Sequence, residues 1–239
     1  MKQLLALILA LALSYTYANW APNAVGSLYK EADNASLQFV CTANVVEGAP
    51  LGYDEAVVVT ASHCLDRDLR FDERTETYSL RGHYLIRLRD LDFYAVTARY
   101  VGYQEQAYDV AILEFVTDRP SGIQPLRLGR WESVEVGAQL HNYANPEGLG
   151  LQYFQGYISQ RYLDRDIGPG QANWRGYALA QLAASGGSSG SLVLNQVREV
   201  IGILIGGIVP RGSRYTVVVP VERLVRLVED ERAGAYIEP

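Results

Sequence analysis

The stretch VVVTASHCLDRD, residues 57–68, ends a strand-like run with an ionisable side chain. Val57–Thr60 is apolar and β-branched, which is typical of a buried strand. Two small residues follow, and His63 and Cys64 then stand side by side. A lone histidine at a strand end is most often a backbone hydrogen-bond partner, so the rest of the sequence must decide whether His63 has a chemical role.

The composition is that of an ordinary globular protein. The 239 residues are 49% hydrophobic and 20% charged, enough for a sizeable core in one or two domains. The formal net charge is −6 and there is no basic cluster, so we expect no nucleic-acid or anionic-membrane partner.

The first residues have the pattern of a targeting segment. Lys2 gives a positive start, and Leu4–Leu13 is an apolar run too short to cross a bilayer. Thr16 and Ala18 are small residues at the −3 and −1 positions of a cleavage site. This pattern predicts a signal peptide over residues 1–18, with a membrane anchor as the alternative. We therefore expect a secreted or periplasmic protein without an integral membrane span, in which residues 19–34 form a leader or linker.

Only two cysteines are present, Cys41 and Cys64. In an exported chain, two cysteines most simply form one disulfide, although free thiols or a thiolate nucleophile are alternatives. Such a bridge would close a loop of about twenty residues and stabilise the fold by roughly 3 kcal/mol.

From about residue 36 the chain alternates short strand-like runs with turns. The runs are 36–46, 56–61, 77–89, 93–103, 109–116, 137–145, 151–163, 174–182, 191–196, 199–209 and 214–221. The turn-rich stretch 120–129 is a connection between two halves, and only residues 222–234 have helical spacing. The ends, 19–34 and 235–239, lack such patterns. An all-β sandwich or barrel is predicted.

The run SGGSSGSLVLN, residues 185–195, carries the strongest chemical signal. A serine hydroxyl becomes a nucleophile only beside a base, and its reaction needs backbone N–H groups aimed at the developing oxyanion. A glycine turn can supply those groups. Ser189, within G-x-S-G, is the candidate nucleophile and His63 the candidate base. Asp109, at the start of a buried strand, is the candidate acid that would hold the imidazole in one tautomer.

These segments resemble the trypsin-like, chymotrypsin-fold serine peptidases. TASHC at 60–64 resembles T-A-A-H-C, YDVAILEF at 108–115 resembles D-[IV]-A-[IVL]-L, and GSSGSLVLN at 187–195 resembles G-N-S-G-G-P-L-V-N of bacterial HtrA-like members. NPEGLG at 145–150 and REVIGI at 198–203 also resemble that group. The resemblance covers about residues 35–232, and we expect no PDZ domain after it.

The resemblance implies two six-stranded antiparallel β-barrels, over about 35–120 and 125–220, and a C-terminal helix over about 221–232. It implies a His63, Asp109 and Ser189 triad, an oxyanion hole from the amides of Gly187 and Ser189, and a Cys41–Cys64 disulfide on the histidine loop. Ala183 would lie at the base of the primary specificity pocket, and the strand near Ile203 and Gly206 would pair with substrate. No cofactor and no metal site are predicted.

The predicted function is peptide-bond hydrolysis of protein or peptide substrates, favouring small or medium apolar P1 residues because Ala183 cannot neutralise a buried cation. Ser188 precedes the nucleophile where animal trypsins have an aspartate, so no activation by N-terminal insertion is expected. Ser191 and Leu192 depart from the family pattern and favour the alternative, a catalytically inactive protein that keeps the fold as a binding or structural module. The oligomeric state is not predicted.

Overall fold

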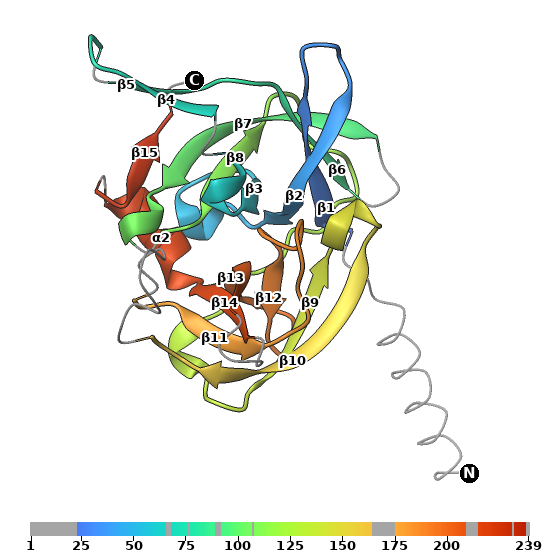
Figure 1. Cartoon of the computed structure of the whole chain (residues 1–239), viewed down its shortest axis with the longest axis vertical. Coiled ribbons are helices and arrows are strands. Elements are labelled where there is room, and N and C mark those ends of the chain that lie inside the picture. Colours follow the sequence, from blue (N-terminus) through green and yellow to red (C-terminus); the bar gives the residue numbers. More distant parts are fainter. Residues whose placement is uncertain are drawn as a thin grey trace.

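Two β-barrels, one above the other in Figure 1, contain most of the strands of the protein. The computed structural model describes residues 23–65, 68–75, 77–88, 92–106, 108–163, 175–208, 215–230 and 232–237. The predicted signal peptide over residues 1–18 lies outside these ranges. Within them, no helix combines the length and the apolar character needed to cross a membrane.

The first barrel closes through pairing of β7 with β8, and its strands follow the order β7-β6-β1-β2-β3-β8. These strands are β1 (Val25–Glu31), β2 (Leu37–Val46), β3 (Val57–Thr60), β6 (Tyr84–Leu88), β7 (Phe93–Gly102) and β8 (Ala111–Phe115). Each neighbouring pair is antiparallel.

The second barrel is also closed and follows the order β10-β11-β14-β13-β12-β9. Its strands are β9 (Gln139–Ala144), β10 (Gln152–Gln160), β11 (Ala178–Gln181), β12 (Leu192–Leu194), β13 (Val200–Ile208) and β14 (Tyr215–Pro220). All three residues of β12 are buried, as the continuous apolar run LVL indicates. The prediction of two six-stranded antiparallel barrels is confirmed.

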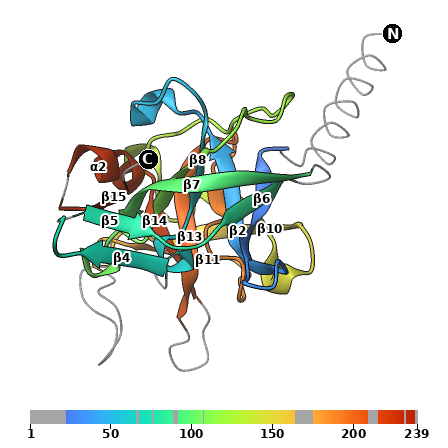
Figure 2. The ribbon, with the colours of Figure 1, turned by 90° about the horizontal axis from the view of Figure 1, so that it is seen from above.

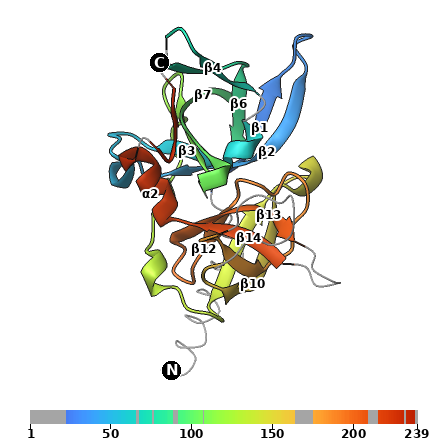
Figure 3. The same cartoon turned by 60° about the vertical axis from the view of Figure 1, so that its left-hand side comes forward.

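The single described α-helix, α2 (Glu222–Glu229), follows β14 and lies beside the junction of the barrels (Figure 3). Leu224 and Leu227, three residues apart, are buried on one side of it. The predicted helix is confirmed, but it ends at Glu229, and the next segment forms β15 (Gly234–Tyr236).

The expectation of a leader or linker over residues 19–34 is wrong from Val25 onward. β1 lies between β2 and β6, and Leu28 pairs with Cys41 on one side and with Ile86 on the other. Leu28 is fully buried. The first barrel therefore starts at β1 rather than near residue 35.

Two further strand predictions need correction. The run 77–89 is two strands, β5 (Thr77–Leu80) and β6, separated by Gly82 with a φ of +113°. β5 forms a hairpin with β4 (Leu69–Asp72). The prediction for the end 235–239 is also wrong over residues 235–237, because β15 pairs with β7 and Ile237 bridges to Tyr78, which places these residues beside the hairpin (Figure 2).

The predicted connection over residues 120–129 runs between the two barrels. Leu126 bridges to Val46 at the end of β2, and Leu128 bridges to Val200 at the start of β13. The same short segment therefore holds one strand of each barrel, which helps to fix the junction where the candidate site lies.

Candidate active site

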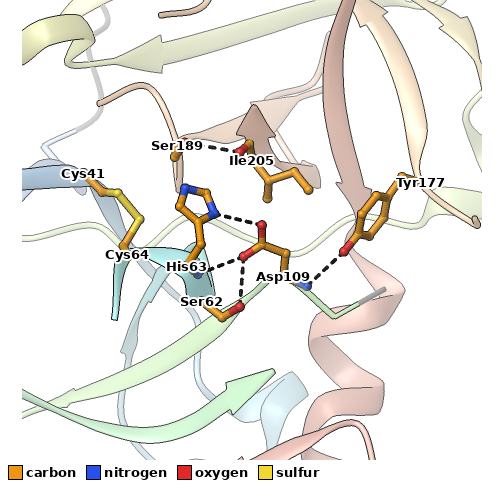
Figure 4. Close-up of polar contacts among 8 residues, drawn as sticks. All are labelled: Cys41, Ser62, His63, Cys64, Asp109, Tyr177, Ser189 and Ile205. Carbon is orange, nitrogen blue, oxygen red and sulfur yellow. Dashed lines mark hydrogen bonds and ion pairs between the residues drawn. A yellow bond between two sulfur atoms is a disulfide. The ribbon is translucent and has the colours of Figure 1, made fainter. Parts of the chain in front are cut away.

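His63 lies in a short 3-10 turn, Ser62–Cys64, directly after β3. All four residues of β3 are buried, so the strand carries the histidine to the junction between the barrels. The side chain of His63 is 33% exposed, and its Nδ1 lies 2.8 Å from Oδ2 of Asp109. Figure 4 shows the imidazole with Asp109 on one side and Ser189 on the other.

Asp109 lies just before β8, and its side chain is only 7% exposed. Its Oδ1 accepts hydrogen bonds from the Ser62 hydroxyl (2.9 Å) and the backbone N–H of His63 (3.0 Å). The N–H of Asp109 donates to the Tyr177 hydroxyl at 3.3 Å (Figure 4). A buried carboxylate is costly unless it accepts hydrogen bonds, and these donors offset that cost.

Sequence reasoning missed Ser62 and Tyr177. Ser62 has a recognisable signal, because it replaces the second alanine of T-A-A-H-C with a hydroxyl donor next to the histidine. Tyr177 has none, since it lies just before β11 of the second barrel and reaches Asp109 across the junction.

Ser189 lies in the loop between β11 and β12. Its hydroxyl donates to the carbonyl of Ile205 in β13 at 3.2 Å. The structure thus brings the three predicted triad residues together, two from the first barrel and one from the second.

The peptide between Gly186 and Gly187 has a fixed orientation. The carbonyl of Gly186 accepts a hydrogen bond from the backbone N–H of Glu147 at 2.7 Å. In a trans peptide the N–H points opposite to the carbonyl, and the described chain has no cis peptide bond. The N–H of Gly187 therefore points away from Glu147.

The peptide between Ser188 and Ser189 is held in the same way. The carbonyl of Ser188 accepts from the N–H of Ser191 at 3.1 Å, so the N–H of Ser189 points away from Ser191. Within the described part of the chain, neither Gly187 nor Ser189 donates its N–H to a protein acceptor. These are the two amides predicted for the oxyanion hole, and they are available to a ligand.

The backbone conformation and close packing at Gly190 explain why a glycine follows Ser189. Its φ is +83°, and a Cβ built there would lie 2.2 Å from the Thr42 carbonyl oxygen and 2.3 Å from Thr60 Oγ1. Only glycine fits such a conformation and such a close approach. The turn after Ser189 is therefore tightly packed against the first barrel.

The two departures from the family pattern are accommodated without disturbing the loop. Ser191 is fully buried, and its hydroxyl accepts a hydrogen bond from Asn142 Nδ2 at 2.9 Å. Leu192 is buried and pairs with Ile203 as the first residue of β12. Neither replacement therefore gives structural support to the inactive-protein alternative.

One predicted substrate-binding residue is wrong. Ile203 is fully buried and pairs with Leu192 on one side and Val219 on the other, so its backbone has no edge for a substrate. The pairing of β12 with β13 ends there. Residues 206–208 pair only with β14, and a Cβ at Gly206 would meet no atom within 4 Å. The open edge of β13 in the described chain thus starts near Gly206, and not at Ile203.

Ala183 is solvent-exposed two residues after β11. The carbonyl of the preceding Leu182 accepts a hydrogen bond of 2.7 Å from Thr216 Oγ1, which fixes the backbone there. The position is therefore accessible to a substrate side chain, and it carries no charge.

Cys41 of β2 and Cys64 of the histidine turn form a disulfide in the structure, with Cα atoms 6.2 Å apart (Figure 4). Cys41, Cys64 and His63 are also the one group in the described residues with ligand atoms close enough to share a metal ion. Disulfide sulfurs are not thiolates, and a thiolate is the form in which cysteine binds metal. The pair therefore restrains the histidine turn and offers no metal site in this state.

Replacing both Cys41 and Cys64 with alanine is expected to lower the free energy of unfolding by roughly 3 kcal/mol, because the bridge joins residues 23 positions apart in the unfolded chain. Urea unfolding followed by circular dichroism measures the change. Wild-type protein with and without dithiothreitol is the matched comparison. If reduction and the double replacement both leave the midpoint unchanged, the bridge does not form in the purified protein.

Two closed six-stranded barrels with a histidine, an aspartate and a serine at their junction define the class of chymotrypsin-fold serine hydrolases. The trypsin-like peptidase domain family matches residues 41–203, and the chain belongs to this family.

Similar proteins extend this finding. The chain is 33% identical over 140 residues to the pro-apoptotic serine protease nma111 of Aspergillus fumigatus, which is 55% of this chain and 13% of that protein. It is 29% identical over 116 residues to a periplasmic serine protease, do/HhoA-like, of Haemophilus influenzae, which is 48% of this chain and 24% of that one. The matched region is therefore a small part of each relative.

Among solved structures, the HtrA-type protease AlgW with a tripeptide superposes with a TM-score of 0.61 at 19% identity. The superposition covers 89% of this chain and 61% of AlgW. At this identity, the likeness shows a shared fold.

Proposed function

We propose that the protein is an exported serine endopeptidase that hydrolyses peptide bonds through an acyl-enzyme, with Ser189 as nucleophile, His63 as base and Asp109 as the acid that orients it. The observation that carries the proposal is the place of the His63 imidazole between Asp109, whose Oδ2 lies 2.8 Å from Nδ1, and Ser189 (Figure 4). The N–H groups of Gly187 and Ser189, which donate to no acceptor in the described residues, add to it. Membership of the trypsin-like peptidase family supports the same reaction.

In the proposed reaction, the Ser189 hydroxyl hydrogen points to Nε2 of His63 rather than to the Ile205 carbonyl. His63 takes this proton as Oγ attacks the substrate carbonyl carbon, and Asp109 stabilises the imidazolium through Nδ1–H. The N–H groups of Gly187 and Ser189 bind the developing oxyanion. His63 then gives the proton to the leaving amine, and water hydrolyses the acyl-enzyme by the same steps.

The substrate backbone is proposed to add as a strand to the open edge of β13 from Gly206 onward. Among the described residues, a Cβ at Gly207 would meet only the Tyr215 carbonyl oxygen, at 3.3 Å, so little side-chain crowding surrounds the strand there.

The protein is proposed to need no inserted N-terminus for activity. Ser188 is fully buried, and its hydroxyl accepts from the N–H of Ser185 at 3.3 Å, so this position is satisfied inside its own loop. Export to a periplasmic or extracellular space is supported by the apolar run of residues 4–13 and by the likeness to the periplasmic serine protease of Haemophilus influenzae. Mass spectrometry of the mature N-terminus tests export, since an uncleaved Met1 in exported protein contradicts the signal peptide.

Digestion of a peptide library is expected to yield cleavage after small or medium apolar P1 residues, because Ala183 places no charge at the proposed pocket base. Mass spectrometry of the fragments reports both activity and preference, and Ser189→Ala is the matched control. Ala183→Asp should move the preference towards lysine and arginine. Cleavage after basic residues by the wild type would refute the role of Ala183. Absence of all cleavage by folded protein would favour the inactive-module alternative.

A further inference from the structure

The loop between β11 and β12 that carries Ser189, called the catalytic loop below, belongs to the second barrel. Thr42 of β2, in the first barrel, contacts this loop through its side chain. The residue is fully buried, and its hydroxyl donates to the carbonyl of Gly187 at 2.8 Å. The same hydroxyl accepts a hydrogen bond from the backbone N–H of Asn145 at 2.9 Å. We propose that Thr42 is a positioning residue for the oxyanion hole, an inference that rests on the proposed function and assigns a new role within it.

The two hydrogen bonds fix the direction of the hydroxyl. A threonine hydroxyl has one hydrogen to donate, and the Asn145 N–H can only donate. The hydrogen of Thr42 must therefore point to the Gly187 carbonyl. The backbone N–H of Thr42 also points there, at 3.0 Å from the Gly187 oxygen and 3.0 Å from the Ser189 oxygen.

Thr42 acts on a glycine that could otherwise rotate. Gly187 has a φ of +82°, and glycine populates both signs of φ with little cost. The peptide before Gly187 is held by the Glu147 N–H, and the peptide after it is held by Thr42. With both neighbouring peptides anchored, the N–H of Gly187 keeps one direction before any substrate binds.

β2 provides this support because alternate residues of a strand share one face. Asn44, two residues after Thr42, donates from Nδ2 to the Gly190 carbonyl at 2.8 Å and is also fully buried. Polar residues on this face of β2 thus hold the carbonyls of the catalytic loop. Thr42 and Gly187, which one of these contacts joins, are 145 positions apart in the sequence.

Replacing Thr42 with valine keeps the shape of the side chain and removes the hydroxyl. We expect Thr42→Val to lower kcat for a peptide substrate by about 10- to 100-fold, less than direct loss of an oxyanion donor, with KM within about threefold of wild type. Affinity for a peptide trifluoromethyl ketone, whose adduct carries the oxyanion, should fall by the same factor as kcat/KM. Affinity for a cleaved product peptide should not change. Thr42→Ser, which restores the hydroxyl, should recover most of the activity.

Tyr84→Phe is the control, because Tyr84 is also buried and the hydroxyl it loses donates to Asp68, which lies outside the catalytic loop. Thermal unfolding should show a loss of stability for both variants, but only Thr42→Val should lose kcat. The proposal is overturned if the two variants lose kcat equally, or if Thr42→Val keeps wild-type kcat. It is also overturned if Thr42→Val loses affinity for the product peptide and for the ketone by the same factor. An inactive wild type is a separate result, since it refutes the proposed function itself and this inference with it.

Discussion

Replacing Ser189 with alanine is expected to lower kcat/KM for peptide hydrolysis by about 10⁶-fold, the loss typical of a removed serine nucleophile. The hydroxyl lies at the barrel junction beside His63, and the backbone N–H of Ser189 is one of the two amides that donate to no described acceptor. The neighbouring Ser188 is not placed to replace it, because its side chain is fully buried inside the loop. Hydrolysis of a fluorogenic peptide measures the loss.

Labelling with a fluorophosphonate probe separates the nucleophile from its neighbours. Wild type and Ser188→Ala are expected to label, and Ser189→Ala is expected not to label. Circular dichroism checks that each variant is folded. Labelling of Ser189→Ala would show that another group is the nucleophile. If no variant labels although all are folded, the protein is not an active serine hydrolase under these conditions and the binding-module alternative gains support.

The parts of the site that the sequence predicts are those with local signatures. His63 and Ser189 are each flanked by small residues and lie near a buried strand, and Asp109 lies just before another strand, so their places could be inferred from short segments. The glycines could be inferred as well, since Gly187 and Gly190 both have positive φ in the structure.

The parts that the sequence does not predict depend on contacts between distant segments. β1 reads as VGSLYKE, with few apolar residues, and it is a strand because β2 and β6 pair with it on both sides. The role of Ile203 is not predictable from the sequence because the run VIGILIGGI has no polar residue, so the pattern cannot show where β12 stops pairing and the edge of β13 opens. The Tyr177 and Thr42 contacts cross the barrel junction, where no sequence periodicity applies.

Asp109→Asn is expected to lower kcat by about 10⁴-fold while the protein stays folded. The reason lies in the donors that surround the carboxylate. Oδ1 of Asp109 faces the backbone N–H of His63, which can only donate, and Oδ2 faces Nδ1 of His63. An asparagine therefore places its oxygen at the Oδ1 site and its NH₂ group at the Oδ2 site. That NH₂ group donates to Nδ1, which moves the imidazole proton to Nε2, and Nε2 can then no longer accept the proton of Ser189.

Ser62→Ala is the matched control for this tautomer argument. It removes the 2.9 Å hydrogen bond to Oδ1 but leaves the negative charge and both His63 contacts, so its kcat should fall by no more than about tenfold. A proton NMR spectrum adds a readout that a general loss of packing would not reproduce. The Nδ1–H resonance of His63 should persist in Ser62→Ala and disappear in Asp109→Asn. An Asp109→Asn enzyme with that resonance intact, or with kcat reduced less than in Ser62→Ala, would show that Asp109 does not set the tautomer of His63.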